Sequence, residues 1–163
     1  MRKIVNLVGV GVLVALSVTA RPVPVDASAA TEMVSGGGTA DFVATSNSVN
    51  TSGFTDFSVG ATVYNDGTAQ GHFVCMVPAV VTISGNVLGG QRNADGSVTV
   101  WGLARGYDHF FKTTFVNMSF TATFREGRAG VGGFDYRDES GFFPLPMQFD
   151  TEVVRRGMIK ILP

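Results

Sequence analysis

The chain has 163 residues, with 12 Lys and Arg against 13 Asp and Glu and a single cysteine. This nearly balanced charge gives no electrostatic reason to expect nucleic acid or an anionic membrane as a partner. One cysteine excludes an internal disulfide, and with only two histidines beside it the chain offers no zinc-ligand spacing.

The first 30 residues have the order of a secretory signal peptide. A basic pair at residues 2–3 precedes an apolar run over residues 4–20, which is followed by prolines and the small residues Ala27-Ser28-Ala29. This order predicts a leader over residues 1–30 that is cleaved on export, so the mature protein is secreted, extracellular or periplasmic, with no stable membrane anchor. The alternative is an uncleaved anchor helix, for which an apolar run of about 17 residues is short.

The remaining residues, 31–163, fit one all-β domain. They are rich in Gly, Thr, Val and Phe, and no apolar stretch repeats at helical spacing. Removing the leader takes away three basic residues and one acidic residue, which leaves 9 positive and 12 negative groups and a net charge of −3. A domain of this size can form a core without disulfides, and we expect Cys75 to be buried in a strand.

Three adjacent glycines, Gly36 to Gly38, precede β-prone residues. The lysine of a phosphate-binding loop is absent, and residues 39–44 alternate as a strand does instead of forming a helix. The glycines therefore predict the start of the first strand, with a bend or a close backbone approach at a sheet rim. The polar stretch at residues 45–53 is expected to be a mobile loop.

Alternating runs continue along the chain. Residues 57–63 and 71–76 flank the tight-turn sequence Asn65-Asp66-Gly67, which predicts an antiparallel hairpin. Residues 81–87 and 98–104 alternate in the same way around a polar connection.

The clearest strand covers residues 116–124. One face is expected to point into the core and holds Val116, Met118, Phe120, Ala122 and Phe124. Further on we expect a strand beginning at Phe134, a loop over residues 138–146, a strand over residues 147–153, a turn at Arg155-Arg156-Gly157 and a closing strand over residues 158–162. Eight or nine short, mostly antiparallel strands predict a small barrel or a sandwich in which the terminal strands pair.

This order of features resembles a group of secreted bacterial all-β domains that are usually described only as hypothetical exported proteins. The resemblance covers residues 34–162 and rests on Val34-Ser35-Gly36-Gly37-Gly38-Thr39, the V-T-I-x-G and F-T-A-T-F strands, the G-R-A-G-x-G turn, F-x-Y-R-D and the terminal G-x-I-x-I strand. It implies a bacterial, exported β-domain and supplies no catalytic residue. Residues 142–146, Phe-Phe-Pro-Leu-Pro, depart from the pattern. A looser likeness, by strand number alone, is to small β-barrels of the allene oxide cyclase and dirigent type.

Neither histidine indicates catalysis. His72 lies on the polar face of a predicted strand, His109 lies in a predicted loop, and no G-x-S-x-G nucleophile motif is present. Asp135, Asp138 and Glu139 form an acidic stretch without calcium-binding spacing. We therefore expect no catalytic residue, no metal site and no cofactor.

Aromatic side chains are the candidate ligand-binding residues, namely Phe110, Phe111, Phe142, Phe143 and Trp101. The two Phe-Phe pairs fall in predicted loops, where they either fold back over an open end of the sheet or line a ligand mouth or a partner surface; we expect them to fold back. Trp101 is expected in the core, and on an outward face it would be a candidate for carbohydrate or protein contact.

The sequence favours a secreted or cell-envelope binding or structural module without enzymatic activity. The alternative is a small β-barrel that binds an apolar ligand, in a cyclase-like or isomerase-like manner. The expected partner is a small apolar ligand or another protein. A third hypothesis is assembly into a larger envelope structure through Cys75 or exposed aromatic residues.

Overall fold

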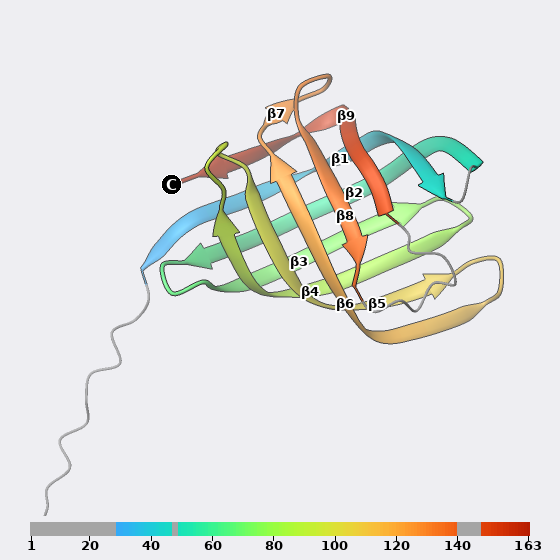
Figure 1. Ribbon diagram of the computed structural model, residues 1–163, viewed down its shortest axis with the longest axis horizontal. Coiled ribbons are helices and arrows are strands. Elements are labelled where there is room, and N and C mark those ends of the chain that lie inside the picture. The colour runs from blue at the N-terminus through green and yellow to red at the C-terminus, as the bar shows by residue number, and fades with distance from the viewer. Residues whose placement is uncertain (1–28, 47–48, 140–147) are drawn as a thin grey trace, which may run out of the picture.

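The computed structural model describes residues 29–46, 49–139 and 148–163 (Figure 1), and within these ranges it contains nine strands and no helix. No helix that is long and apolar enough to span a membrane therefore occurs in the described chain. The strands are β1 (Ala30–Ser46), β2 (Val49–Tyr64), β3 (Thr68–Val77), β4 (Val81–Arg92), β5 (Val98–Asp108), β6 (Thr113–Arg125), β7 (Gly127–Arg128), β8 (Gly133–Asp138) and β9 (Gln148–Leu162).

The strands form one antiparallel sheet whose pairing closes into a ring. The order β1-β2-β3-β4-β5-β6-β8-β9 returns to its start because β9 also pairs with β1. On its other edge, β9 meets β8 along its first half and the two-residue β7 along its second half. The predicted all-β, mostly antiparallel single domain is confirmed, as is the pairing of the terminal strands.

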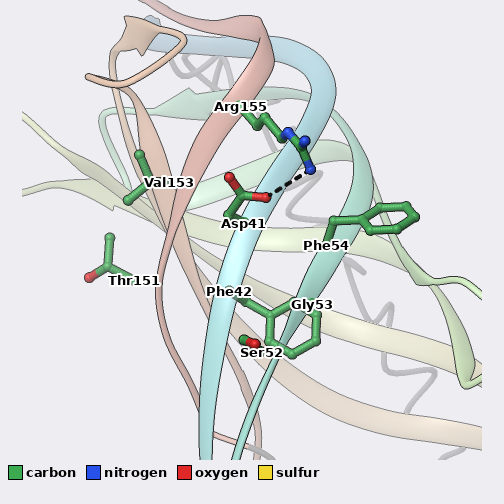
Figure 2. Close-up of a pocket in the computed structure, with 8 residues that line it drawn as sticks. All are labelled: Asp41, Phe42, Ser52, Gly53, Phe54, Thr151, Val153 and Arg155. Carbon is green, nitrogen blue, oxygen red and sulfur yellow. Dashed lines mark ion pairs between the residues drawn. The ribbon is translucent and has the colours of Figure 1, made fainter.

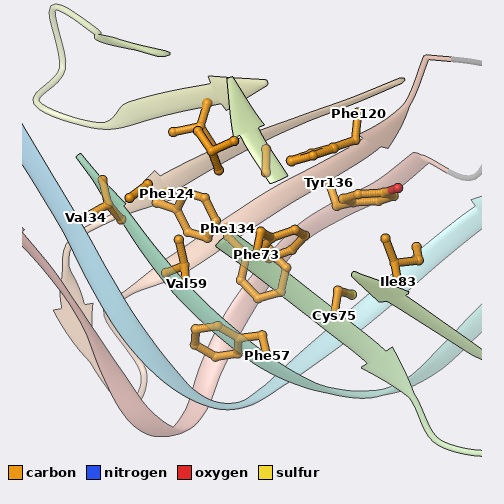
Figure 3. Packing of buried hydrophobic residues seen from close by; sticks show 14 of the residues in the cluster. Val34, Phe57, Val59, Phe73, Cys75, Ile83, Phe120, Phe124, Phe134 and Tyr136 are labelled. Atoms are coloured by element: carbon orange, nitrogen blue, oxygen red, sulfur yellow. The ribbon is translucent and has the colours of Figure 1, made fainter. Parts of the chain in front are cut away.

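The core lies inside this ring, where aliphatic side chains surround a cluster of aromatic rings (Figure 3). Alternation along each strand sends every second side chain inward. Phe73 is fully buried, and four other rings have centroids 5.6 to 6.0 Å from its own, those of Phe120, Phe124, Phe134 and Tyr136. Such pairs add about 1 kcal/mol each beyond the burial of their surface. Cys75 is 1% exposed, which confirms its predicted burial.

The hairpin predicted around Asn65-Asp66-Gly67 is confirmed as β2–β3. The Asp66 carboxylate accepts hydrogen bonds from the backbone N–H of Thr68 at 2.9 Å and from its hydroxyl at 2.6 Å. Gly67 has a φ of +80°, which glycine adopts without strain. The aspartate side chain and the glycine backbone together account for the tight turn.

The expectation of a mobile loop at residues 45–53 is wrong. β1 and β2 stay paired as far as Ser46 and Val49, so the described part of this stretch is the end of a long hairpin. The ladder bonds come from the backbone, and Thr and Val favour strands even among polar neighbours. β1 also begins at Ala30, so the three glycines lie inside the strand and not at its start.

The close backbone approach predicted at the glycines is confirmed along the seam between β1 and β9. A Cβ on Gly36 would lie 2.5 Å from the carbonyl oxygen of Met158, so only glycine allows β9 to pass at this distance. On β9, Gly157 pairs with Gly38 and has a φ of +98°, a backbone conformation that residues with a side chain rarely adopt.

The predicted turn at Arg155-Arg156-Gly157 is wrong, because β9 runs through these residues without a break. The ladder to β1 skips Arg155, pairing Arg156 with Thr39 and Val154 with the next residue of β1. One extra residue in a strand is a bulge, which bends the strand without ending it. A glycine after two charged residues therefore marks a bulge here and not a turn.

β6 keeps its predicted core face except near its start. Residues Met118, Phe120, Ala122 and Phe124 are buried, but Val116 is 49% exposed, so its predicted burial is wrong. Asn117 has a φ of +56°, and the register between β5 and β6 shifts at this level. Because of this irregularity, Val116 points to the outer face of the sheet and not to the core, as regular alternation from Met118 would predict.

Candidate functional site

The connection between β5 and β6 carries Phe110 and Phe111 at its tip. Their side chains are 79% and 72% exposed, so the expectation that they fold back over an end of the sheet is wrong. The connection projects at one end of the ring of strands (Figure 1, right). Phe142 and Phe143, the other predicted pair, lie outside the described residues.

The tip is held in place by hydrogen bonds from its own backbone. The Asp108 carboxylate accepts from the N–H of Phe110 at 2.7 Å and from that of Phe111 at 2.8 Å. The two phenyl rings meet edge to face with centroids 5.0 Å apart. The N–H of His109 donates to the carbonyl of Val80 at 2.8 Å and so joins the tip to the turn between β3 and β4. These bonds order the backbone of the tip, which lowers the entropic cost of binding through it.

Trp101 lies on the outer face of the sheet, 38% exposed, so its predicted place in the core is wrong. It pairs across the ladder with Gly89, whose missing side chain leaves room for the indole ring. Leu88 and Leu103 on the same two strands are also exposed. β5 continues from Trp101 as far as Asp108, about 23 Å of extended strand, before the connection that carries Phe110, so the structure does not bring these two predicted site residues together.

A hollow of about 820 Å³ opens where β1, β2 and β9 meet (Figure 2). Each strand contributes an exposed side chain: Asp41 from β1, Phe54 from β2 and Arg155 from β9. Nη1 of Arg155 lies 3.5 Å from Oδ1 of Asp41. The other lining residues are Phe42, Ser52, Gly53, Thr151 and Val153.

A smaller hollow of about 370 Å³ shares Phe54 and Arg155 with the first and adds Thr39, Asp56 and Arg156. The Thr39 hydroxyl donates to Oδ1 of Asp56 at 2.9 Å. Sequence reasoning missed both hollows, because their residues come from three separate segments and no local motif joins them. The sequence Arg155-Arg156-Gly157 could have indicated the hollow, if it had been interpreted as a bulge in a strand and not as a turn.

Both histidines contact hydroxyl groups: His72 reaches from β3 to β4, and His109 reaches from the β5–β6 connection to β4. Nε2 of His72 lies 3.2 Å from Oγ of Ser84, and Nε2 of His109 lies 2.8 Å from Oγ1 of Thr82. The Ser84 contact is exposed, as expected for a histidine on a polar face. In the described part of the chain, no group of three or more His, Cys, Asp and Glu side chains is placed to hold a metal ion.

Glu152 is a fully buried carboxyl group that the sequence does not reveal. Neither of its carboxyl oxygens has a hydrogen-bond partner within the described chain. Burial raises the pKa of Glu152 to about 7; the neighbouring Thr55 hydroxyl lowers it in part, without reaching hydrogen-bond geometry, and the charge of Asp135 raises it further. Burial, with Glu152 as a second cause, also raises the pKa of the Cys75 thiol.

No known protein family, curated protein or solved structure matches this chain. The fold and its surface therefore define a class only: a small antiparallel β-domain, closed by its first and last strands, with a projecting aromatic tip and an outer hollow. The resemblance to exported bacterial β-domains and the likeness to dirigent-type barrels stay predictions.

Proposed function

We propose that the protein is a secreted or cell-envelope binding module without enzymatic activity, and that it binds a protein partner through the Phe110–Phe111 tip. The observation that carries this proposal is the exposure of two adjacent phenyl rings on a connection fixed by Asp108. Exposed apolar surface of this kind, rimmed by polar residues, marks interaction sites.

The physical gain from covering the tip is large. Complete burial of a phenylalanine side chain contributes about 2 to 3 kcal/mol, so the two rings together offer about 5 kcal/mol. The two rings already meet edge to face, so a partner can enclose them without first moving one ring against the other. The exposed Lys112 next to Phe111 provides a charged rim. An apolar centre with a polar rim is the arrangement typical of protein interfaces.

The alternative proposal, an apolar ligand inside the sheet, has less support from the packing. The rings of Phe57 and Phe134 lie 4.8 Å apart in the interior, and Phe73 is surrounded by other rings. A ligand would have to displace these side chains. Assembly through Cys75 also has little support, since the thiol is buried. The aromatic tip remains the better-supported contact.

Site-specific photo-crosslinking tests the proposal. A benzophenone amino acid replaces Phe111 in one variant and Val131 in a control, whose side chain is 71% exposed but lies between β7 and β8. Both variants are illuminated in the secreted and envelope fractions of the cells that make the protein. We expect a discrete protein adduct from position 111 that position 131 does not give.

The partner identified from this adduct is then purified, and its dissociation constant is measured for the wild type and for the Phe110→Ala/Phe111→Ala variant. We expect the constant to rise about thirtyfold or more, because hot-spot residues contribute more than about 1 kcal/mol each. Equal adducts from both positions, or an unchanged constant, contradict the proposal. So does turnover of ester, glycoside or peptide substrates that His109→Ala abolishes.

A further inference from the structure

We infer that the hollow at the junction of β1, β2 and β9 is a binding site for a short neutral oligosaccharide. This inference does not depend on the aromatic tip, which lies on the separate β5–β6 connection. It rests on the irregular seam between β1 and β9, on the charge balance of the exposed side chains, and on the mixture of polar and apolar groups that line the hollow.

The seam between β1 and β9 is irregular where the hollow lies. The ladder skips Arg155, and its register shifts again between Asp41 and Ala44. Bulges re-aim side chains and are frequent beside functional sites. Here the bulge leaves Arg155 and Arg156 both exposed, although neighbouring residues of a regular strand face opposite sides. The backbone is thus shaped to bring two guanidinium groups to one surface.

The charges of the two adjoining hollows balance. Arg155 faces Asp41, and both side chains are more than half exposed, at 64% and 58%. Arg156 and Asp56 line the adjoining hollow and supply one more charge of each sign. Two positive and two negative groups leave no net charge that would favour an anionic or a cationic ligand. A neutral, strongly hydrogen-bonding ligand fits this surface best.

Sugar hydroxyls match the polar groups of the hollow. Each hydroxyl both donates and accepts, so it can accept from the Arg155 guanidinium and donate to the Asp41 carboxylate at once. The separation of 3.5 Å between that guanidinium and carboxylate leaves their hydrogen-bonding capacity for a ligand. Ser52 and Thr151 add further hydroxyl groups to the lining.

Apolar groups suited to the C–H face of a sugar ring stand beside these polar ones. Phe54 and Val153 are each 43% exposed and both line the larger hollow. A hollow of about 820 Å³ lies within the range of roughly 300 to 1,000 Å³ that holds small-molecule ligands. The smaller hollow continues from it past Phe54 and Arg155, which suits a chain of sugars and not a single ring.

The test is an NMR titration of the ¹⁵N-labelled protein with cellotriose, maltotriose, xylotriose and chitotriose, and with the anionic trigalacturonate. We expect at least one neutral trisaccharide to shift the amide signals of residues 39–41, 52–56 and 151–156 with saturation. Phe54→Ala should weaken that binding about tenfold, as loss of an aromatic contact does. Asp41→Asn, which keeps the shape of the side chain, should weaken it as well.

Leu103→Ala is the control, since it removes an exposed apolar side chain on the outer face of β5 and should leave the affinity unchanged. Failure of all four neutral sugars to bind at these residues overturns the inference. Binding of trigalacturonate and of none of the neutral sugars would contradict the inference that the ligand is neutral. If a neutral sugar binds and neither Phe54→Ala nor Asp41→Asn weakens that binding, the sugar does not bind in this hollow and the inference is wrong.

Discussion

Replacing Glu152 by glutamine should remove a pH-dependent loss of stability. In the folded protein the carboxyl group is buried without a hydrogen-bond partner in the described chain, and its pKa rises from 4.5 to about 7. The folded state therefore holds the proton more tightly than the unfolded chain does. Between pH 4.5 and 7 the unfolded chain releases its proton first, so the stability of the wild type falls as the pH rises.

The size of this effect follows from the pKa difference. Each pKa unit corresponds to about 1.36 kcal/mol, so the rise from 4.5 to about 7 corresponds to about 3 kcal/mol. The stabilising contribution of protonated Glu152 is present in full below pH 4.5 and is lost by the time the pH has passed 7. Above that range the contribution of this residue no longer changes. Glutamine is neutral throughout and should lack the slope.

Urea unfolding of both proteins, followed by far-ultraviolet circular dichroism from about pH 4 to about pH 8, measures the effect. The free energy of unfolding of the wild type, minus that of Glu152→Gln, should fall by about 3 kcal/mol over this range. Taking the difference cancels the other titrating groups. Parallel curves for the two proteins would show that Glu152 has an ordinary pKa, and the buried, unpartnered arrangement would then be wrong.

Three further predictions concern single contacts. Arg92→Ala should cost about 2 kcal/mol in urea unfolding, because Arg92 bonds the buried Glu32 at 2.6 Å, and an effect below experimental error would refute this. Asp108→Ala should speed amide exchange at Phe110 and Phe111 while leaving the core amides protected; unchanged exchange at the tip would mean that the carboxylate does not hold it. Cys75 should not react with a thiol reagent until the protein unfolds, since burial raises the thiol pKa, and rapid labelling of the native protein would contradict this.

Much of the fold could be predicted from the sequence, because local alternation and turn chemistry determine it. The β2–β3 hairpin follows from two alternating runs around Asn65-Asp66-Gly67, and the core face of β6 follows from its regular pattern. These features depend on residues close together in the chain. The errors occur where distant pairing decides the outcome: Arg155 is the extra residue of a bulge, and β9 continues through Gly157 because β1 pairs alongside it.

The candidate site was predictable only in part, for a related reason. Phe110 and Phe111 are recognisable as aromatic residues in a connection, but only the structure shows that Asp108 fixes them and that both are exposed. Trp101 was misplaced because Gly89, on the neighbouring strand, gives it room on the outer face. The hollow joins three strands, so no single stretch of sequence contains its signal.

The binding role of the aromatic tip is tested most directly by comparing two variants against the partner obtained by crosslinking. Phe110→Ala/Phe111→Ala removes both exposed rings, and Val131→Ala removes an equally exposed apolar side chain elsewhere. We expect the dissociation constant to rise about thirtyfold or more for the first variant and to stay at the wild-type value for the second. Equal affinity of the wild type and both variants would contradict it.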